Sequence, residues 1–186
     1  MHITRLQRAV TRAALITVAA LSFTSAARAA DDNRAPELPA VCQSAQQNIQ
    51  APDGHKVAFR AYAVGVQVYR WDGAAWGFVG PVAGLYADHN YRGQVGTHYG
   101  GPTWEGNGGG RVVGRRAAGC TPDASAIPWL LLEAASTDGH GIFSRVTYVQ
   151  RVNTAGGLAP AAPGSFVNEE KRVPYTTEYY FYRAAN

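Results

Sequence analysis

From residue 49 onward the chain consists of short runs rich in Val, Tyr and Phe, separated by glycine and proline. No segment after residue 48 shows the 3.6-residue hydrophobic period of a helix over ten or more residues. The 21 glycines and 10 prolines fall in short clusters, as expected for many strands joined by turns. No unit of about 20–50 residues repeats, which argues against a propeller or solenoid. We therefore predict one all-β domain over residues 49–186, a single antiparallel β-sandwich or β-barrel.

The longest predicted strand covers residues 57–71. Its side chains alternate, so Gln67 falls on the face opposite Val66. Gly65 lies in the middle of this run and predicts a bulge or bend. Asp72-Gly73 follows and predicts a hairpin turn.

A second alternating run covers residues 144–152 and raises the question of Gln150. This amide shares a face with three apolar residues, Val146, Tyr148 and Val152. If that face is interior, the amide must be hydrogen-bonded. It is then either a satisfied structural amide or, at a barrel mouth, a group that orients a ligand. We keep Gln150 as a candidate ligand-binding residue.

The N-terminal segment indicates export. Arg5, Arg8 and Arg12 precede a short apolar run, and Ala27-Arg28-Ala29 supplies a small-x-small cleavage site. We predict a signal peptide over residues 1–29, a leader segment over residues 30–48, and a secreted or periplasmic protein. The alternative is an amphipathic N-terminal helix retained in the mature chain. The apolar run is shorter than the ~20 residues that a membrane span needs, so we predict no membrane span in the mature protein.

Charge excludes one class of partner. The whole chain carries a formal net charge of +4, but four of its 17 basic residues lie in the predicted signal peptide. Their removal leaves 13 basic residues against 13 acidic ones. A domain without net positive charge does not attract the negatively charged backbone of nucleic acid, so we predict that it binds no nucleic acid.

The two cysteines, Cys42 and Cys120, can form only one pair. In an exported protein a disulfide is the default, and it would close a loop of nearly eighty residues. Such a crosslink is worth about 4 kcal/mol when the native geometry permits it. The alternative is a pair of free buried thiols.

Five segments, in order, resemble a known family. They are YAVGVQVY at 62–69, GTHYGGPTWE at 96–105, IPWLLL at 127–132, VTYVQRVNT at 146–154, and VPYT at 173–176 running into EYYFYR at 178–183. The chain is similar to the bacterial and fungal family called domain of unknown function 3455. The resemblance implies a secreted protein and brings no established reaction, cofactor or catalytic residue. Some fungal relatives carry a malate dehydrogenase label, but this chain has no glycine fingerprint opening a helix.

The densest polar cluster consists of Asp88, His89, His98 and Glu105. These side chains suit metal binding or acid–base chemistry, but their spacing is not compact, so we predict no metal site. The Gly100-Gly101-Pro102 bend is expected to return Trp104 and Glu105 toward the imidazole of His98. His98, Trp104 and Glu105 are therefore candidate ligand-binding residues. Replacing His98 or Trp104 by alanine is expected to abolish binding with little change in melting temperature.

Two functions remain open. The first is a non-enzymatic binding or envelope protein with an aromatic-lined pocket for a small molecule or glycan. The second is a secreted hydrolase or metal-assisted enzyme centred on His98 and Glu105. No serine lies in a G-x-S-x-G elbow and no P-loop is present, so the first hypothesis leads, with no cofactor and no catalytic residue assigned. The sequence carries no signal for the oligomeric state.

Overall fold

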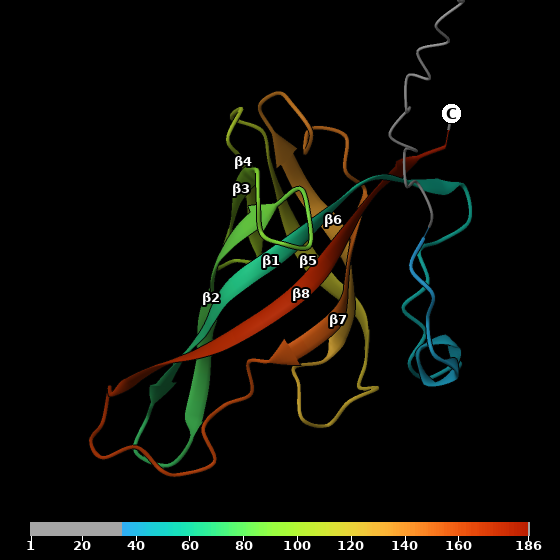
Figure 1. Cartoon of the computed structure of the whole chain (residues 1–186). Coiled ribbons are helices and arrows are strands. Elements are labelled where there is room, and N and C mark those ends of the chain that lie inside the picture. Colours follow the sequence, from blue (N-terminus) through green and yellow to red (C-terminus); the bar gives the residue numbers. More distant parts are fainter. Residues whose placement is uncertain (1–34, 186) are drawn as a thin grey trace, which may run out of the picture. The chain divides into compact units, whose positions relative to one another are not determined.

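A computed structural model of the chain describes residues 35–185. Eight antiparallel strands follow one another around a closed barrel, and β8 pairs back with β1 (Figure 1). The described elements are η1 (Ala40–Gln43), β1 (His55–Trp71), β2 (Trp76–Tyr86), β3 (Gln94–Tyr99), β4 (Thr103–Gly106), β5 (Arg111–Cys120), β6 (Trp129–Asp138), β7 (Tyr148–Gly156) and β8 (Glu170–Ala184). The all-β prediction is confirmed, and of its two architectures the chain adopts the barrel.

The predicted signal peptide, residues 1–29, lies outside the described residues, as do the first five residues of the predicted leader. The remainder of that leader contains η1, a 3-10 turn of four residues. Between residues 35 and 185, no helix reaches the length and hydrophobicity that a membrane crossing requires.

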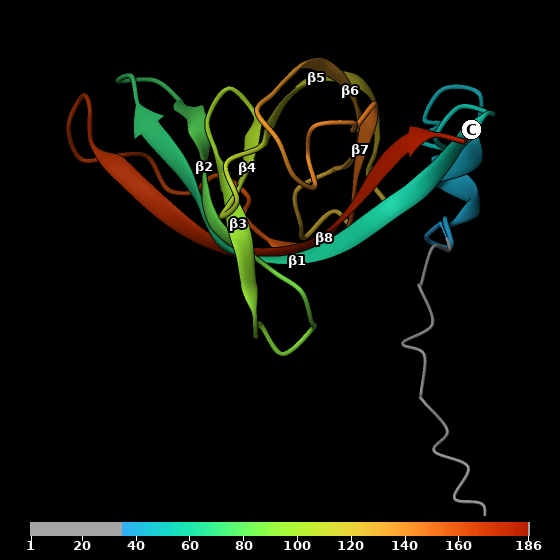
Figure 2. The same ribbon diagram turned by 90° about the horizontal axis from the view of Figure 1, so that it is seen from above.

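The two longest strands close the barrel. β1 has 17 residues and β8 has 15, and they pair from His55 with Ala184 to Arg70 with Glu170. The second half of β1 also pairs with β2, so it is hydrogen-bonded on both edges. Figure 2 shows β1 and β8 curving side by side along their length. Because the sheet closes, each of the eight strands has a neighbouring strand on both sides along at least part of its length.

Gly65 does not mark a bulge, which was one of the two predicted features. The register is regular there, with Gly65 opposite Ala83 of β2 and Tyr175 of β8. The register of β1 shifts elsewhere, between Val57 and Phe59 and between Val68 and Tyr69. Glycine is needed at position 65 for a different reason, since a Cβ there would overlap the backbone of β2.

Alternation places small residues of β1 and large residues of β8 inside the barrel. Ala61 is the register partner of Tyr179, and Phe59 is the partner of Phe181. The rings of Phe59 and Phe181 stack at 4.4 Å, and Phe143 contacts both. Phe143 comes from the β6–β7 connection, so this cluster fills the barrel at that end. Each buried ring of this size stabilises the fold by about 1.5–3 kcal/mol.

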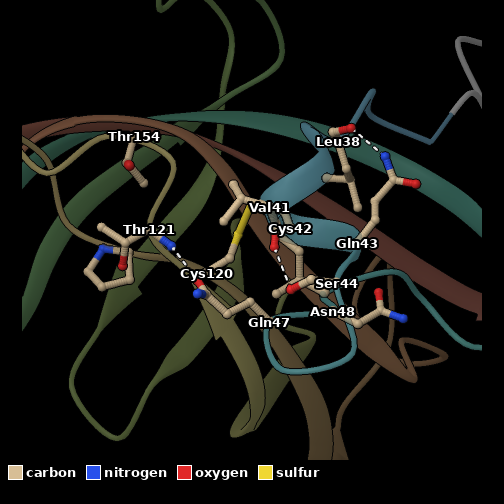
Figure 3. The surroundings of a disulfide bond; sticks show 12 residues. Leu38, Val41, Cys42, Gln43, Ser44, Gln47, Asn48, Cys120, Thr121 and Thr154 are labelled. Carbon is tan, nitrogen blue, oxygen red and sulfur yellow. Dashed lines mark hydrogen bonds between the residues drawn. A yellow bond between two sulfur atoms is a disulfide. The ribbon is translucent and has the colours of Figure 1, made fainter.

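A second apolar cluster lies on the outer face, where the segment around η1 covers β7 and β8. Ile49 and Cys42 are fully buried there, beside Tyr180 and Tyr182. The disulfide between Cys42 and Cys120 is present, with the Cα atoms 5.3 Å apart (Figure 3). The predicted disulfide is thus confirmed, and it fastens the N-terminal segment to the last residue of β5.

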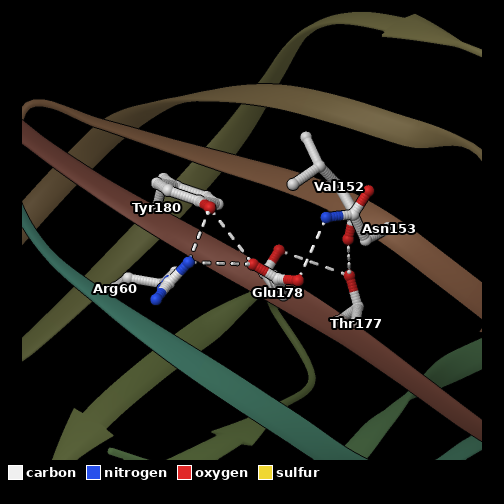
Figure 4. A network of polar contacts seen from close by, with 6 residues as sticks. All are labelled: Arg60, Val152, Asn153, Thr177, Glu178 and Tyr180. Atoms are coloured by element: carbon white, nitrogen blue, oxygen red, sulfur yellow. Dashed lines mark hydrogen bonds and ion pairs between the residues drawn. The ribbon is translucent and has the colours of Figure 1, made fainter. Parts of the chain in front are cut away.

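The outer face next to this cluster carries a polar network across β1, β8 and β7 (Figure 4). Glu178 accepts hydrogen bonds from the Tyr180 hydroxyl (3.1 Å) and the Asn153 amide (3.0 Å), and lies 3.7 Å from the Arg60 guanidinium. Asn153 sits at a register shift of β7 with φ +51°, a conformation that asparagine tolerates better than most residues. The network therefore supports an irregular part of the sheet.

Candidate functional site

A cavity of about 290 Å³ lies inside the barrel. All eight strands contribute to its wall, from Gln67 of β1 to Tyr179 of β8, together with the β3–β4 turn. Most of its residues lie next to the β1–β2, β3–β4 and β5–β6 connections. The phenylalanine cluster fills the opposite end, so the barrel is packed at one end and hollow at the other.

Two glycines help to shape this wall. A Cβ at Gly114 would lie 2.9 Å from the ring of Trp104 and 3.2 Å from the side chain of Leu132. A Cβ at Gly80 would lie 3.0 Å from the backbone of Gly100 in the β3–β4 turn. Because glycine has no side chain, the Trp104 ring can lie close to β5 and the β3–β4 turn can approach β2.

His98 and Trp104 form the centre of the wall. They are register partners on β3 and β4, and their rings stack with centroids 4.5 Å apart and planes 7° apart. The ring of Tyr179 meets both edge-on, at 5.1 Å from His98 and 5.4 Å from Trp104. All three side chains are buried, with exposed fractions of 3%, 1% and 0% respectively. The predicted bend therefore does bring Trp104 against His98.

The imidazole of His98 is neutral. Burial lowers its pKa from 6.5 to about 3; the Thr103 carbonyl opposes this shift and the Arg151 charge adds to it. Nδ1 lies 2.8 Å from the Thr103 carbonyl oxygen, which can only accept, so Nδ1 carries the proton. Nε2 is then left as a hydrogen-bond acceptor.

Buried polar atoms without partners gather at this cavity. Gln67 Nε2, Trp104 Nε1 and Tyr179 Oη all belong to wall residues, and none makes a hydrogen bond to another described residue. Tyr175 Oη is also unpartnered, and burial raises the pKa of this hydroxyl, so it keeps its proton. Leaving such a group unsatisfied costs about 1–3 kcal/mol, so native proteins seldom bury several together without a reason.

Arg151 is a cation of the same wall, and its charge acts on several of these groups. Its Nε and Nη2 donate to the Pro128 carbonyl oxygen at 3.1 and 2.7 Å, which fixes the guanidinium against the wall. Its positive charge lowers the pKa of His98 and acts on the pKa of Tyr69, Tyr175 and Tyr179, which burial raises. No carboxylate among residues 35–185 forms an ion pair with it.

Glu105 does not join His98. It is adjacent to Trp104 on β4 and pairs with Thr97, so its side chain points to the opposite face of the sheet. There it accepts a hydrogen bond of 2.6 Å from the Tyr99 hydroxyl. The expectation that the bend would return both Trp104 and Glu105 to the imidazole therefore fails for Glu105, because successive strand residues face opposite ways.

The other polar candidates also lie away from the cavity. Gln150 faces outward under the N-terminal segment; its amide donates to Ile49 O and accepts from the Tyr182 hydroxyl, both at 2.7 Å. It is a satisfied structural amide, one of the two predicted roles. Asp88 accepts from the backbone N–H groups of Asn90 and Arg92 in the β2–β3 connection, as in an Asx turn. Within the described range, no three His, Cys, Asp or Glu side chains are placed to hold a metal ion.

Three wall residues central to the site, Gln67, Arg151 and Tyr179, were not among the predicted candidates. Gln67 could have been found, because it is the one amide in an apolar run and its face was assigned opposite to Val66. Arg151 shares a face with Val149, but the sequence leaves open which face of this run is interior; the structure places both residues on the interior face. No sequence pattern distinguishes Tyr179 from its neighbours, because it lies in a run of four aromatic residues.

The neutral state of His98 predicts a pH dependence of stability. The pKa of His98 is 6.5 in the unfolded chain and about 3 in the folded chain. Between these two pH values, only the unfolded state binds a proton at this group. The resulting stabilisation is complete above pH 6.5 and is lost as the pH falls, at about 1.4 kcal/mol per pH unit. We expect urea unfolding at pH 6.5 and 4.5 to show a loss of about 2–3 kcal/mol.

His98→Gln should remove most of that loss, since glutamine takes up no proton. The control is His140→Gln at an exposed position, which should keep the wild-type pH dependence. Equal slopes for all three proteins would contradict the assignment of the slope to His98.

The fold and the site together define a class, an eight-stranded antiparallel barrel with an aromatic and partly polar internal cavity. The chain belongs to the family described as protein of unknown function (DUF3455), whose model matches residues 52–183. The matched residues include β1 to β7, β8 as far as Arg183, and thus the whole cavity wall. Neither a search of curated proteins nor a search of solved structures finds a match.

Proposed function

We propose that this protein is an exported, non-enzymatic binding protein that holds a small molecule in the barrel cavity. The observation that carries the proposal is the set of unpartnered buried atoms of Gln67, Trp104 and Tyr179 around a cavity of about 290 Å³. That volume is close to the lower end of the range of about 300–1,000 Å³ typical of small-molecule pockets. Partners in a ligand would remove the penalty of burying these atoms unsatisfied.

Export is supported by the Ala27-Arg28-Ala29 cleavage site and by the disulfide, which is typical of oxidising compartments. A secreted or periplasmic location is the proposal that follows. A soluble ligand carrier in such a compartment needs no catalytic apparatus.

A small molecule fits the cavity better than a glycan. Sugars bind proteins by stacking on an open aromatic face, and one face of Trp104 is covered by the imidazole of His98. Much of the remaining wall is apolar, with Phe78, Pro81, Leu130 and Leu132 among its members. This composition suits a compact molecule with an apolar body and a few polar atoms.

The enzyme hypothesis gains no support from the geometry. A general base needs an orienting or reacting group within hydrogen-bond reach, and the carboxylate of Glu105 lies on the other face of the sheet. Burial also lowers the pKa of His98 to about 3, far below the operating pH near which the pKa of an effective general base lies. We therefore assign His98 to shaping the cavity wall.

Binding can be tested with two naphthalene probes of nearly equal size, 2-naphthoate and 2-naphthamide. We expect isothermal titration calorimetry to detect one-to-one binding of at least one probe to the mature, oxidised protein. Leu130→Trp adds bulk to a half-buried wall position and should reduce affinity at least 10-fold. The matched control is Leu158→Trp, at an exposed position outside the cavity wall, which should bind as the wild type does. Absence of binding to the wild type, or equal binding by both variants, would overturn the proposal.

A further inference from the structure

The charges in the cavity wall are unbalanced. The wall contains Arg115, Arg116 and Arg151 but no aspartate or glutamate. Arg115 is already paired with Glu133 at 2.6 Å and is largely exposed, and Arg116 is exposed to solvent as well. Arg151 is therefore the half-buried cation of the wall that has no carboxylate among the described residues.

Buried or half-buried charges in proteins are ordinarily paired, because removal from water disfavours an isolated ion. Arg151 is held in place by the Pro128 carbonyl, which satisfies two of its N–H groups without neutralising its charge. The guanidinium has five N–H donors in a planar fork, so it retains donors for a second partner.

The unpartnered atoms of the same cavity wall add to this donor set. Tyr179 is its register partner on β8, and burial raises the pKa of Tyr179, so the hydroxyl keeps its proton and can donate. Gln67 Nε2 and Trp104 Nε1 are N–H donors by their chemistry. A wall that presents a cation and three donors is complementary to a group that only accepts hydrogen bonds.

We infer that the ligand is an organic carboxylate with an apolar body, and that its carboxylate lies against Arg151 within reach of Tyr179, Gln67 and Trp104. This inference rests on the proposed function and specifies the ligand class of the same cavity. A single negative charge is indicated because, among the described wall residues, Arg151 is the one unbalanced cation that is withdrawn from solvent. The apolar part of the ligand then lies against Leu130, Leu132 and Phe78.

The two naphthalene probes separate this inference from the proposed function. At pH 7 the acid is ionised, since an ordinary carboxylic acid has a pKa near 4. We expect 2-naphthoate to bind about 10- to 100-fold more tightly than 2-naphthamide, the range expected for a hydrogen-bonded charge in a protein site. Equal affinities would refute the carboxylate while leaving the binding function in place. Failure of both probes would instead reject the proposed function.

Arg151→Gln should remove the preference, lowering the affinity for 2-naphthoate about 10- to 100-fold and leaving that for 2-naphthamide within a factor of three. Arg151→Lys keeps the charge and should retain a preference for the anion. Arg183→Gln removes an exposed arginine outside the cavity wall and serves as the control with wild-type behaviour. If Arg151→Gln fails to fold, the comparison of the two probes on the wild type still tests whether the cavity prefers a carboxylate. An unchanged preference in a folded Arg151→Gln protein would contradict the inference.

Discussion

Trp104→Ala is expected to lower the free energy of unfolding by about 3–5 kcal/mol, the usual effect of deleting a large buried aromatic side chain. Trp104 is 1% exposed and belongs to the barrel core. Its ring stacks on His98 and meets Tyr179 and Phe181 edge-on. Alanine would remove all of these contacts and enlarge the existing cavity, which the closed sheet cannot collapse to fill. Urea denaturation monitored by far-ultraviolet circular dichroism measures the loss.

The matched control is Trp76→Ala. Trp76 lies at the start of β2, packs against Trp71 and donates one hydrogen bond to the Ala162 carbonyl. Its loss should cost much less than that of Trp104, because it is only half-buried. A smaller loss for Trp104→Ala than for Trp76→Ala would show that the Trp104 ring does not support the core.

This prediction replaces the expectation that Trp104→Ala would leave the melting temperature nearly unchanged. That expectation assumed a ring at a pocket mouth, whereas the ring is a buried part of the wall. Loss of binding by Trp104→Ala would therefore mix a direct effect with a loss of stability. Variants at Leu130 and Arg151 test the cavity more directly, because both side chains are only half-buried.

Removal of the disulfide, by Cys42→Ala with Cys120→Ala, is expected to lower the free energy of unfolding by about 4–5 kcal/mol. The bond links positions 78 residues apart, so it withdraws much conformational freedom from the unfolded chain. Chemical denaturation of the oxidised wild type and of the double variant gives the difference. Wild-type protein treated with a reductant should approach the stability of the double variant.

The same variant should loosen the N-terminal segment before the barrel. Without the bond, the segment is held by the packing of Ile49 and by the hydrogen bond from Gln150 to its carbonyl. Hydrogen exchange should therefore rise first at residues 40–50 and remain slow in β1 and β8. Gln46→Ala, at an exposed position in the same segment, provides the control that leaves both stability and exchange unchanged. Equal stability of oxidised and disulfide-free protein would contradict the predicted role.

Local patterns in the sequence determined the fold class and several turns. Alternation is a property of the strand backbone itself, so the runs at 57–71 and 144–152 indicate β structure without knowledge of their partners. Asp72-Gly73 forms the predicted hairpin because its requirements are also local; Asp72 caps the backbone N–H groups of Ala74 and Ala75. The disulfide was predictable because two cysteines leave one pairing.

Alternation also determines how Trp104 and Glu105 are oriented relative to His98. Adjacent strand residues face opposite ways, so Trp104 and Glu105 were not both able to turn toward His98. Likewise, the inward positions of Gln67 and Arg151 follow once the interior face of each strand is known. The sequence shows which residues of a strand share a face, but it does not show which of the two faces is interior.

Only the tertiary structure determines which face of each strand lies inside the barrel. The β1–β8 pairing, which joins residues more than one hundred positions apart, closes the barrel and makes the alanine and glycine face of β1 the interior. The outer face of β7 and β8 is apolar too, because η1 and Ile49 cover it, so hydrophobicity did not distinguish inside from outside. Closure also collects Gln67, Trp104, Arg151 and Tyr179 around one cavity from four different strands. Contacts of that kind depend on how distant segments meet in space, and no local pattern encodes them.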